Sequence, residues 1–177
     1  MDISHKSEVS MDHPFSELKA HYLEAVEQGF PAFIRSIKES NPINATPYVV
    51  GLSEFLRSDL PPAKAGLLGN LGAALEMLPE IGLRAEIMLI GGSFLMRDAS
   101  PRDLDCVLYY SRETEPKADL ARWQADRRAS GLDIRLVPIE MDPVMVLKMT
   151  LFFGVLYTFG REEQPQMRGL LLVDCSK

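Results

Sequence analysis

Two aspartates separated by one residue are the first sign of chemistry in this sequence. Asp103 and Asp105 flank Leu104, and an apolar stretch follows from Cys106 to Tyr110. Successive side chains of a β-strand point to opposite faces, so both carboxylates lie on one face, with Leu104 and Cys106 on the other. Neighbouring carboxylates repel each other, and a divalent cation removes this repulsion. Hard oxygen ligands suit Mg²⁺ or Mn²⁺, so the spacing predicts a site for one of these ions.

A glycine-rich turn precedes the aspartates. The apolar run over residues 87–90 ends in Gly91, Gly92 and Ser93, which is typical of a buried strand that leads into a helix. Glycine lets the backbone approach a ligand closely. The amides that begin a helix form an anion site suited to phosphate, and the serine hydroxyl adds to it. We therefore expect these three residues to bind the phosphates of a metal-bound nucleotide.

The order of these segments resembles a known signature. A Gly-Ser helix start, ten residues from Ser93 to Asp103, and Asp-x-Asp on the next strand resemble the DNA polymerase beta-type nucleotidyltransferase superfamily. That superfamily usually has a third acidic residue on a neighbouring strand, and the resemblance assigns Asp133 to this place. It implies that Asp103, Asp105 and Asp133 are catalytic and hold a pair of Mg²⁺ or Mn²⁺ ions. Arg135 shares the face of Asp133, where it either pairs with that carboxylate or binds a phosphate.

Further segments resemble one bacterial nucleotidyltransferase-like family with no established activity. These are Thr46–Val50, the Gly-Gly-Ser and Asp-x-Asp segments, and Phe159-Gly160-Arg161 followed by a short apolar strand. The similarity covers roughly residues 45–175. It implies a fold and a metal site and leaves the substrate open.

Hydrophobic periodicity predicts the elements that position these residues. Apolar strands alternate with amphipathic helices, which predicts an α/β fold with a short mixed sheet flanked by helices. We expect strands over residues 86–90, 104–110, 132–139 and 167–173, and helices over 62–78, 92–96, 117–129 and 144–157. Asp142 and Pro143 are a strong start for the last helix. Gly66, Gly69 and Gly72 indicate close packing of the helix over 62–78 against the sheet.

The chain divides into three parts by composition and pattern. Residues 1–13 are polar and are expected to be disordered. Residues 14–60 are expected to form an N-terminal helical extension, and residues 61–177 the nucleotidyltransferase-like domain. The extension has expected helices over residues 14–28, over 33–39 and, shorter, within 48–60.

Composition limits the class of partner. The chain has 177 residues, 46% of them hydrophobic, which is enough for one sizeable core. Its net charge of −6 argues against a nonspecific nucleic-acid binder and suits a nucleoside triphosphate better. Cys106 and Cys175 lie far apart and are expected to be reduced thiols of a cytoplasmic protein. No apolar run reaches membrane-spanning length, so we expect no membrane partner.

Two functions stay open at this point. The first is a metal-dependent enzyme that transfers a nucleotidyl group to a protein, an RNA or a small molecule. The second is a noncatalytic binding or regulatory protein on the same scaffold, such as a toxin, antitoxin or immunity component. The largely apolar helix over 144–157 favours the second modestly, because it offers a face to a protein partner.

Overall fold

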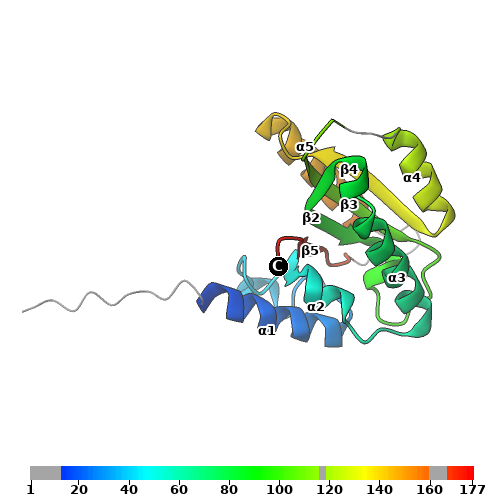
Figure 1. Cartoon of the computed structure of the whole chain (residues 1–177). Coiled ribbons are helices and arrows are strands. Elements are labelled where there is room, and N and C mark those ends of the chain that lie inside the picture. The colour runs from blue at the N-terminus through cyan, green and yellow to red at the C-terminus, as the bar shows by residue number, and fades with distance from the viewer. Residues whose placement is uncertain (1–12, 116–118, 160–166) are drawn as a thin grey trace, which may run out of the picture.

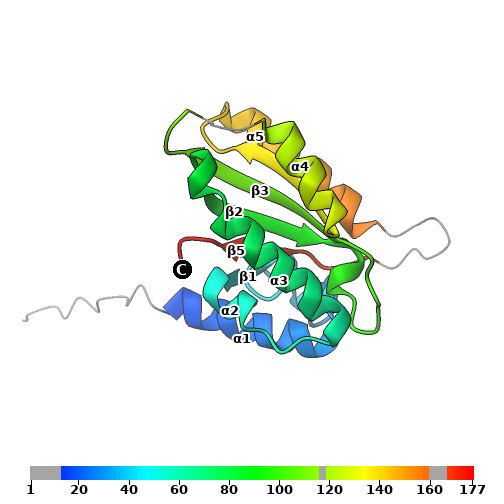
Figure 2. The same cartoon turned by 45° about the vertical axis from the view of Figure 1, so that its right-hand side comes forward.

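The structure is a computed structural model that describes residues 13–115, 119–159 and 167–177. Within these residues, five strands form a mixed sheet with helices packed on both faces (Figures 1 and 2). The expected α/β architecture is therefore confirmed. Residues 1–12 of the segment expected to be disordered lie outside the described residues, as do Gly160 and Arg161.

The sheet places sequence-distant strands side by side. Its spatial order is β1 (Tyr48–Gly51), β5 (Leu171–Asp174), β2 (Leu83–Gly91), β3 (Leu104–Arg112) and β4 (Leu132–Pro138). β1 runs parallel to β5, and β3 runs parallel to β4. β2 is antiparallel to both of its neighbours. The central strands β2, β3 and β4 begin and end close to the expected residues.

One face of the sheet carries the main core. It is covered by α1 (His13–Gln28), α2 (Leu52–Leu56), α3 (Pro62–Glu76) and α4 (Leu120–Ala129). Leu104 and Cys106 of β3 are fully buried on this face, as the alternation predicts. In Figure 2, α3 and α4 cross in front of the sheet and α5 (Pro143–Thr158) lies behind it.

The opposite face is packed by α5. Its first turn is capped as expected, because the Asp142 carboxylate accepts hydrogen bonds from the amides of Val144 and Met145. Phe153 and Tyr157 of α5 pack against Leu89, Val107 and other sheet residues in a second, smaller core. Among the described residues, no helix is both long and apolar enough to cross a membrane.

The N-terminal segment differs from the expected helical extension. The helix expected over 33–39 is wrong: a short 3₁₀-helix, η1 (Ile37–Glu39), stands there. The backbone is extended at Ser36 and at Ser40, which limits helical structure to this single turn. The short helix expected within 48–60 is present as α2, whereas the start of that stretch, Tyr48–Gly51, forms β1. Tyrosine and valine favour strands, and β5 supplies the hydrogen-bonding partner.

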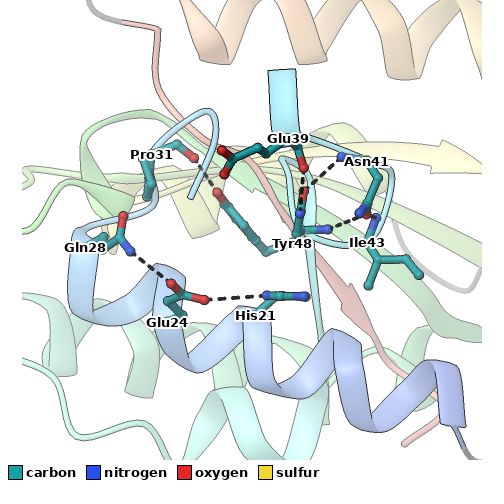
Figure 3. Close-up of polar contacts among 9 residues, drawn as sticks. His21, Glu24, Gln28, Pro31, Glu39, Asn41, Ile43 and Tyr48 are labelled. Atoms are coloured by element: carbon teal, nitrogen blue, oxygen red, sulfur yellow. Dashed lines mark hydrogen bonds and ion pairs between the residues drawn. The ribbon is translucent and has the colours of Figure 1, made fainter. Parts of the chain in front are cut away.

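Polar contacts hold this segment against the sheet (Figure 3). The Tyr48 hydroxyl donates a hydrogen bond of 2.7 Å to the Pro31 carbonyl oxygen, which ties the loop after α1 to β1. The Asn41 side chain accepts a hydrogen bond of 2.8 Å from the Ile43 amide and so closes a turn. β1 is thereby fixed at one edge of the sheet.

The expected packing of the α3 glycines is wrong. A methyl group at Gly66 or Gly69 would meet no atom within 4 Å, and at Gly72 it would lie 3.8 Å from Leu56 Cδ2. The buried face of α3 is instead formed by larger residues, including Leu68 and Leu71. These leucines lie at helical spacing toward the sheet, which leaves Gly66 and Gly69 on the solvent side.

Candidate functional site

Four of the predicted site residues line one pocket. Gly92, Ser93, Asp103 and Asp105 border an open pocket with a volume of about 680 Å³. It forms because β2 ends where β3 begins, and the antiparallel register sets Gly91 opposite Asp105. The 3₁₀-helix η3 (Gly92–Leu95) starts directly after β2, so the expected strand-to-helix junction is present, although the helix is only one turn long.

Asp133 lies beside Asp105 and is already engaged. The parallel register of β3 and β4 pairs the two residues, which places both side chains on the face that α5 covers. Arg128 of α4 contacts one Asp133 oxygen at 3.0 Å, and Arg135 contacts the other at 3.1 Å. Arg135 thus pairs with this carboxylate, the first of its two expected roles. Neither Asp133 nor Arg135 lines the pocket, and their predicted roles toward a ligand stay predictions.

The charge of Asp105 is disfavoured in this setting. Burial raises the pKa of its carboxyl to about 6, and the negative charges of Asp103 and Asp133 add to the rise. Arg135 and Arg168 act in the opposite direction without cancelling it. A cation bound in the pocket would relieve this conflict.

Both glycines of the turn are required by internal packing. A methyl group at Gly91 would lie 2.5 Å from Tyr157 Cβ, so Gly91 allows α5 to approach the sheet. Gly92 has a φ of +70°, and a methyl group there would lie 2.5 Å from Asp105 Oδ2. Gly91 is therefore an α5 contact, whereas Gly92 borders the pocket.

Several residues of the pocket were missed by the sequence reasoning. Arg102 and Arg168 bring positive charge to it, and Leu156, Tyr157 and Phe159 form an apolar wall. Arg102 stands next to Asp103, so its position in the sequence was a usable signal. Arg168 and Tyr157 are more than 50 residues away from the aspartates, and the fold alone brings them there. Burial raises the pKa of Tyr157 above its ordinary value, so its hydroxyl stays neutral.

The donor set suits one cation better than two. Among the described residues, no group of three or more His, Cys, Asp or Glu side chains is arranged to hold a metal ion. Asp105 of β3 and Asp103, which lies just before β3, both line the pocket and offer two carboxylates. Mg²⁺ is commonly held by one or two carboxylates, with water and substrate phosphates as the other ligands. The pocket therefore fits a single Mg²⁺ or Mn²⁺ ion.

A pocket of similar size lies elsewhere in the fold. It has a volume of about 730 Å³ and lies among α1, α2 and the end of β1. None of the predicted site residues lines it. Its Lys19 and Glu54 pair with each other at 3.1 Å, so this charge pair is satisfied within the protein. We therefore place the candidate site at Asp103 and Asp105.

Comparison with known proteins gives a family and no activity. The chain belongs to a family of unknown function, DUF6932, whose model matches residues 51–173. No curated protein and no solved structure matches the chain. The matched region contains every residue that lines the candidate pocket. It also contains every predicted site residue, from Gly91 to Arg135.

Proposed function

We propose that this DUF6932 member binds a nucleoside triphosphate together with Mg²⁺ or Mn²⁺ and transfers its nucleotidyl group to an acceptor hydroxyl. The observation that carries the proposal is the shared pocket of Gly92, Ser93, Asp103 and Asp105. The order of a strand, a Gly-Ser turn and a carboxylate-bearing neighbouring strand supports a nucleotidyltransferase-like fold. The fold and the pocket together support the activity more directly than either does alone.

Each pocket residue has a proposed part in binding. Asp103 and Asp105 hold the cation, which when bound neutralises phosphate charge and activates the acceptor hydroxyl. Arg102 and Arg168 bind phosphate oxygens, which guanidinium groups do well. Tyr157 and Phe159 contact the nucleoside from the apolar side of the pocket.

The proposed transfer is a displacement at the α-phosphorus. The acceptor oxygen forms a bond to that phosphorus, the bond to the bridging oxygen breaks, and pyrophosphate leaves. The acceptor proton passes to a pocket carboxylate or to water. The positive charges of Arg102 and Arg168 stabilise the negative charge that develops on the departing pyrophosphate.

A noncatalytic protein on the same scaffold is the second candidate. It is favoured by the pairing of Asp133 with Arg128 and Arg135, which leaves this carboxylate engaged without a metal. The exposed apolar face of α5 also suits a protein with a partner. A protein of this kind is expected to bind a ligand or a partner without turning a nucleotide over.

Metal-dependent stabilisation tests the proposal. Mn²⁺ that binds the folded chain and not the unfolded chain adds about 2.7 kcal/mol of stability at one hundred times its Kd. For a chain of this length, this corresponds to a rise in Tm of about 5–10 °C. We expect a nucleoside triphosphate to raise the Tm further. The Asp103→Asn/Asp105→Asn variant is expected to lose both shifts while remaining at least as stable without metal.

The matched control is Asp126→Asn, which removes an exposed carboxylate of α4 outside the pocket. It is expected to keep both shifts. If Mn²⁺ leaves the wild-type melting curve unchanged, the enzyme proposal fails. If the shifts occur, labelled nucleotide is offered with proteins and RNA as acceptors. Binding without any label transfer would favour the noncatalytic candidate.

A further inference from the structure

The outward face of α5 is apolar and exposed. Residues 143–158 contain no acidic side chain and only one basic one, Lys148. Inward-facing residues such as Phe153 and Tyr157 pack on the sheet. The outward apolar side chains of α5 and its C-cap are between 43% (Met145) and 70% (Val144) exposed. They are Val144, Met145, Leu147, Leu151, Phe152, Val155, Leu156 and Phe159. We call this set the outer α5 face.

The outer α5 face is larger than an ordinary apolar patch. At roughly 100 Å² each, its side chains expose roughly 800 Å², against roughly 300–600 Å² for the largest patch of a typical monomer. One partner of a standard protein–protein interface contributes about 800 Å². Complete burial of the outer α5 face would therefore reach the size of a standard interface.

We propose that the outer α5 face binds the same face of a second copy of the chain, which forms a two-fold symmetric dimer. A two-fold interface brings a surface against itself, so the surface must be self-complementary. An apolar helix face meets this requirement, because no like-charged carboxylates come together across the axis. The net charge of −6 per chain repels a second copy, and this repulsion is weakest at α5, which has no acidic residue.

The charge pattern favours a second copy over other occupants. A partner with its own basic surface would find no carboxylate on α5 to pair with. An anionic lipid surface would repel a chain of net charge −6. Lys148 can extend its ammonium group to the rim of the interface while its stem stays apolar.

The dimer would also border the candidate pocket. Leu156 and Phe159 belong to the outer α5 face and line the pocket as well. A second copy on this face would therefore cover one side of the pocket mouth. The inference of the dimer itself does not depend on nucleotide transfer, because it uses only the α5 face.

The oligomeric state of the full chain tests the inference. Light scattering after gel filtration and sedimentation equilibrium are run from about 0.1 to 100 µM, a range set by the micromolar or tighter affinity common for interfaces of this size. No metal or nucleotide is added, so failure of the proposed function does not affect the result. The wild-type chain is expected to show twice its mass of 19.8 kDa.

Leu151→Glu places a charge near the middle of the outer α5 face and is expected to give a monomer with at least 100-fold weaker association. Ile37→Glu is the matched control, since Ile37 is 69% exposed on η1 and does not belong to the outer α5 face. It is expected to stay dimeric. Circular dichroism melts check that each variant is folded, and Leu151→Ala replaces Leu151→Glu if the charge unfolds the chain.

Three results of the association measurements would overturn the inference. They are a wild-type chain that stays monomeric up to about 100 µM, a folded Leu151 variant that dimerises as tightly as wild type, and open polymers in place of a closed pair. Flotation with phosphatidylcholine vesicles is run in parallel. A monomer that floats with the vesicles through Leu151 would assign the outer α5 face to lipid and would also overturn the dimer.

Discussion

At the scale of single residues, Asp105 carries the least favourable charge of the candidate pocket. Burial and the carboxylates of Asp103 and Asp133 raise its pKa to about 6, from an ordinary value of 3.8. The folded chain therefore binds this proton more tightly than the unfolded chain does. Between about pH 4 and pH 6 the contribution of Asp105 to stability falls as pH rises, and above pH 6 its ionised form destabilises the fold.

Replacing Asp105 with asparagine is expected to remove the loss of stability that ionised Asp105 causes. Asp105→Asn should be more stable than wild type at pH 7 by about 1 kcal/mol, a difference discounted for solvent screening. The advantage should vanish near pH 4, where the wild-type carboxyl is protonated. Urea unfolding of both proteins at several pH values between 4 and 8 measures the difference.

The control for this comparison is Asp126→Asn, which replaces an exposed carboxylate of α4 outside the pocket. The pKa of some other carboxyls is lowered where that of Asp105 is raised; hydrogen bonds from Ser111 and Arg84, for example, lower the pKa of Glu86. Their contribution cancels when wild type and variant are compared. A variant that is less stable than wild type at pH 7, with no pH trend, would contradict the account of Asp105.

The residues of the pocket were only partly predictable from the sequence. Period-two alternation correctly placed Leu104 and Cys106 in the core, because a strand leaves each side chain only two directions. The contribution of Arg168 could not be predicted in this way. It reaches the pocket because the backbone returns from α5 toward β5, and that return is a property of the topology.

At the scale of elements, α3 contains two glycines whose spacing predicted close packing that the structure does not have. Gly66 and Gly69 recur at helical spacing, which indicated close packing, yet open space surrounds both. Glycine in a helix interior is less favourable than alanine by about 0.5–1 kcal/mol, because the unfolded chain gains more freedom. These two positions therefore lower the stability of α3 without a packing gain in the structure.

Alanine at both positions is expected to stabilise the chain. Gly66→Ala/Gly69→Ala should add about 1–2 kcal/mol to the free energy of unfolding, a rise in Tm of about 2–8 °C. Gly82→Ala is the opposite control, because Gly82 has a φ of +81° and a methyl group there would lie 3.2 Å from the Thr114 carbonyl oxygen. It should destabilise. A drop in Tm for the double variant would contradict the account of Gly66 and Gly69 as helix positions surrounded by open space.

The element boundaries show where sequence patterns are sufficient. The long elements were predicted from extended patterns: β2 from an apolar run that ends in glycines, β3 from period-two alternation, and α5 from its Asp-Pro start and largely apolar length. β1 was missed because it spans only Tyr48–Gly51 and its pairing partner, β5, lies over 100 residues later. Local propensity cannot reveal a partner at that distance, so the short strand was read as part of a helical segment.

At the scale of the whole molecule, the segment before residue 61 is part of the main core. Tyr22 of α1, Tyr48 of β1 and Phe55 of α2 are each buried to within 3% of full burial and belong to the same cluster as the strands. β1 also covers the outer edge of β5. Although the family match begins at residue 51, the packing predicts that both parts fold as one cooperative unit.

A shortened chain of residues 61–177 tests this cooperativity. Truncating one large buried aromatic typically costs about 3–5 kcal/mol. The shortened chain loses Tyr22, Tyr48 and Phe55 together, and the summed cost of about 9–15 kcal/mol is comparable to a typical total stability of about 5–15 kcal/mol. It also exposes the β5 edge. We therefore expect it to show no cooperative thermal transition and to bind a dye for exposed apolar surface.

The full-length Tyr48→Phe variant separates loss of the segment from loss of one contact. It removes only the hydroxyl that donates to the Pro31 carbonyl oxygen and should cost about 1 kcal/mol. Calorimetry should then show one transition, as in the wild-type chain, at a slightly lower Tm. If residues 61–177 instead melt cooperatively within a few degrees of the full chain, the main core is complete without α1, β1 and α2. The helices before residue 61 would then be an addition to an independent domain, because their buried aromatics would not be needed to close the sheet.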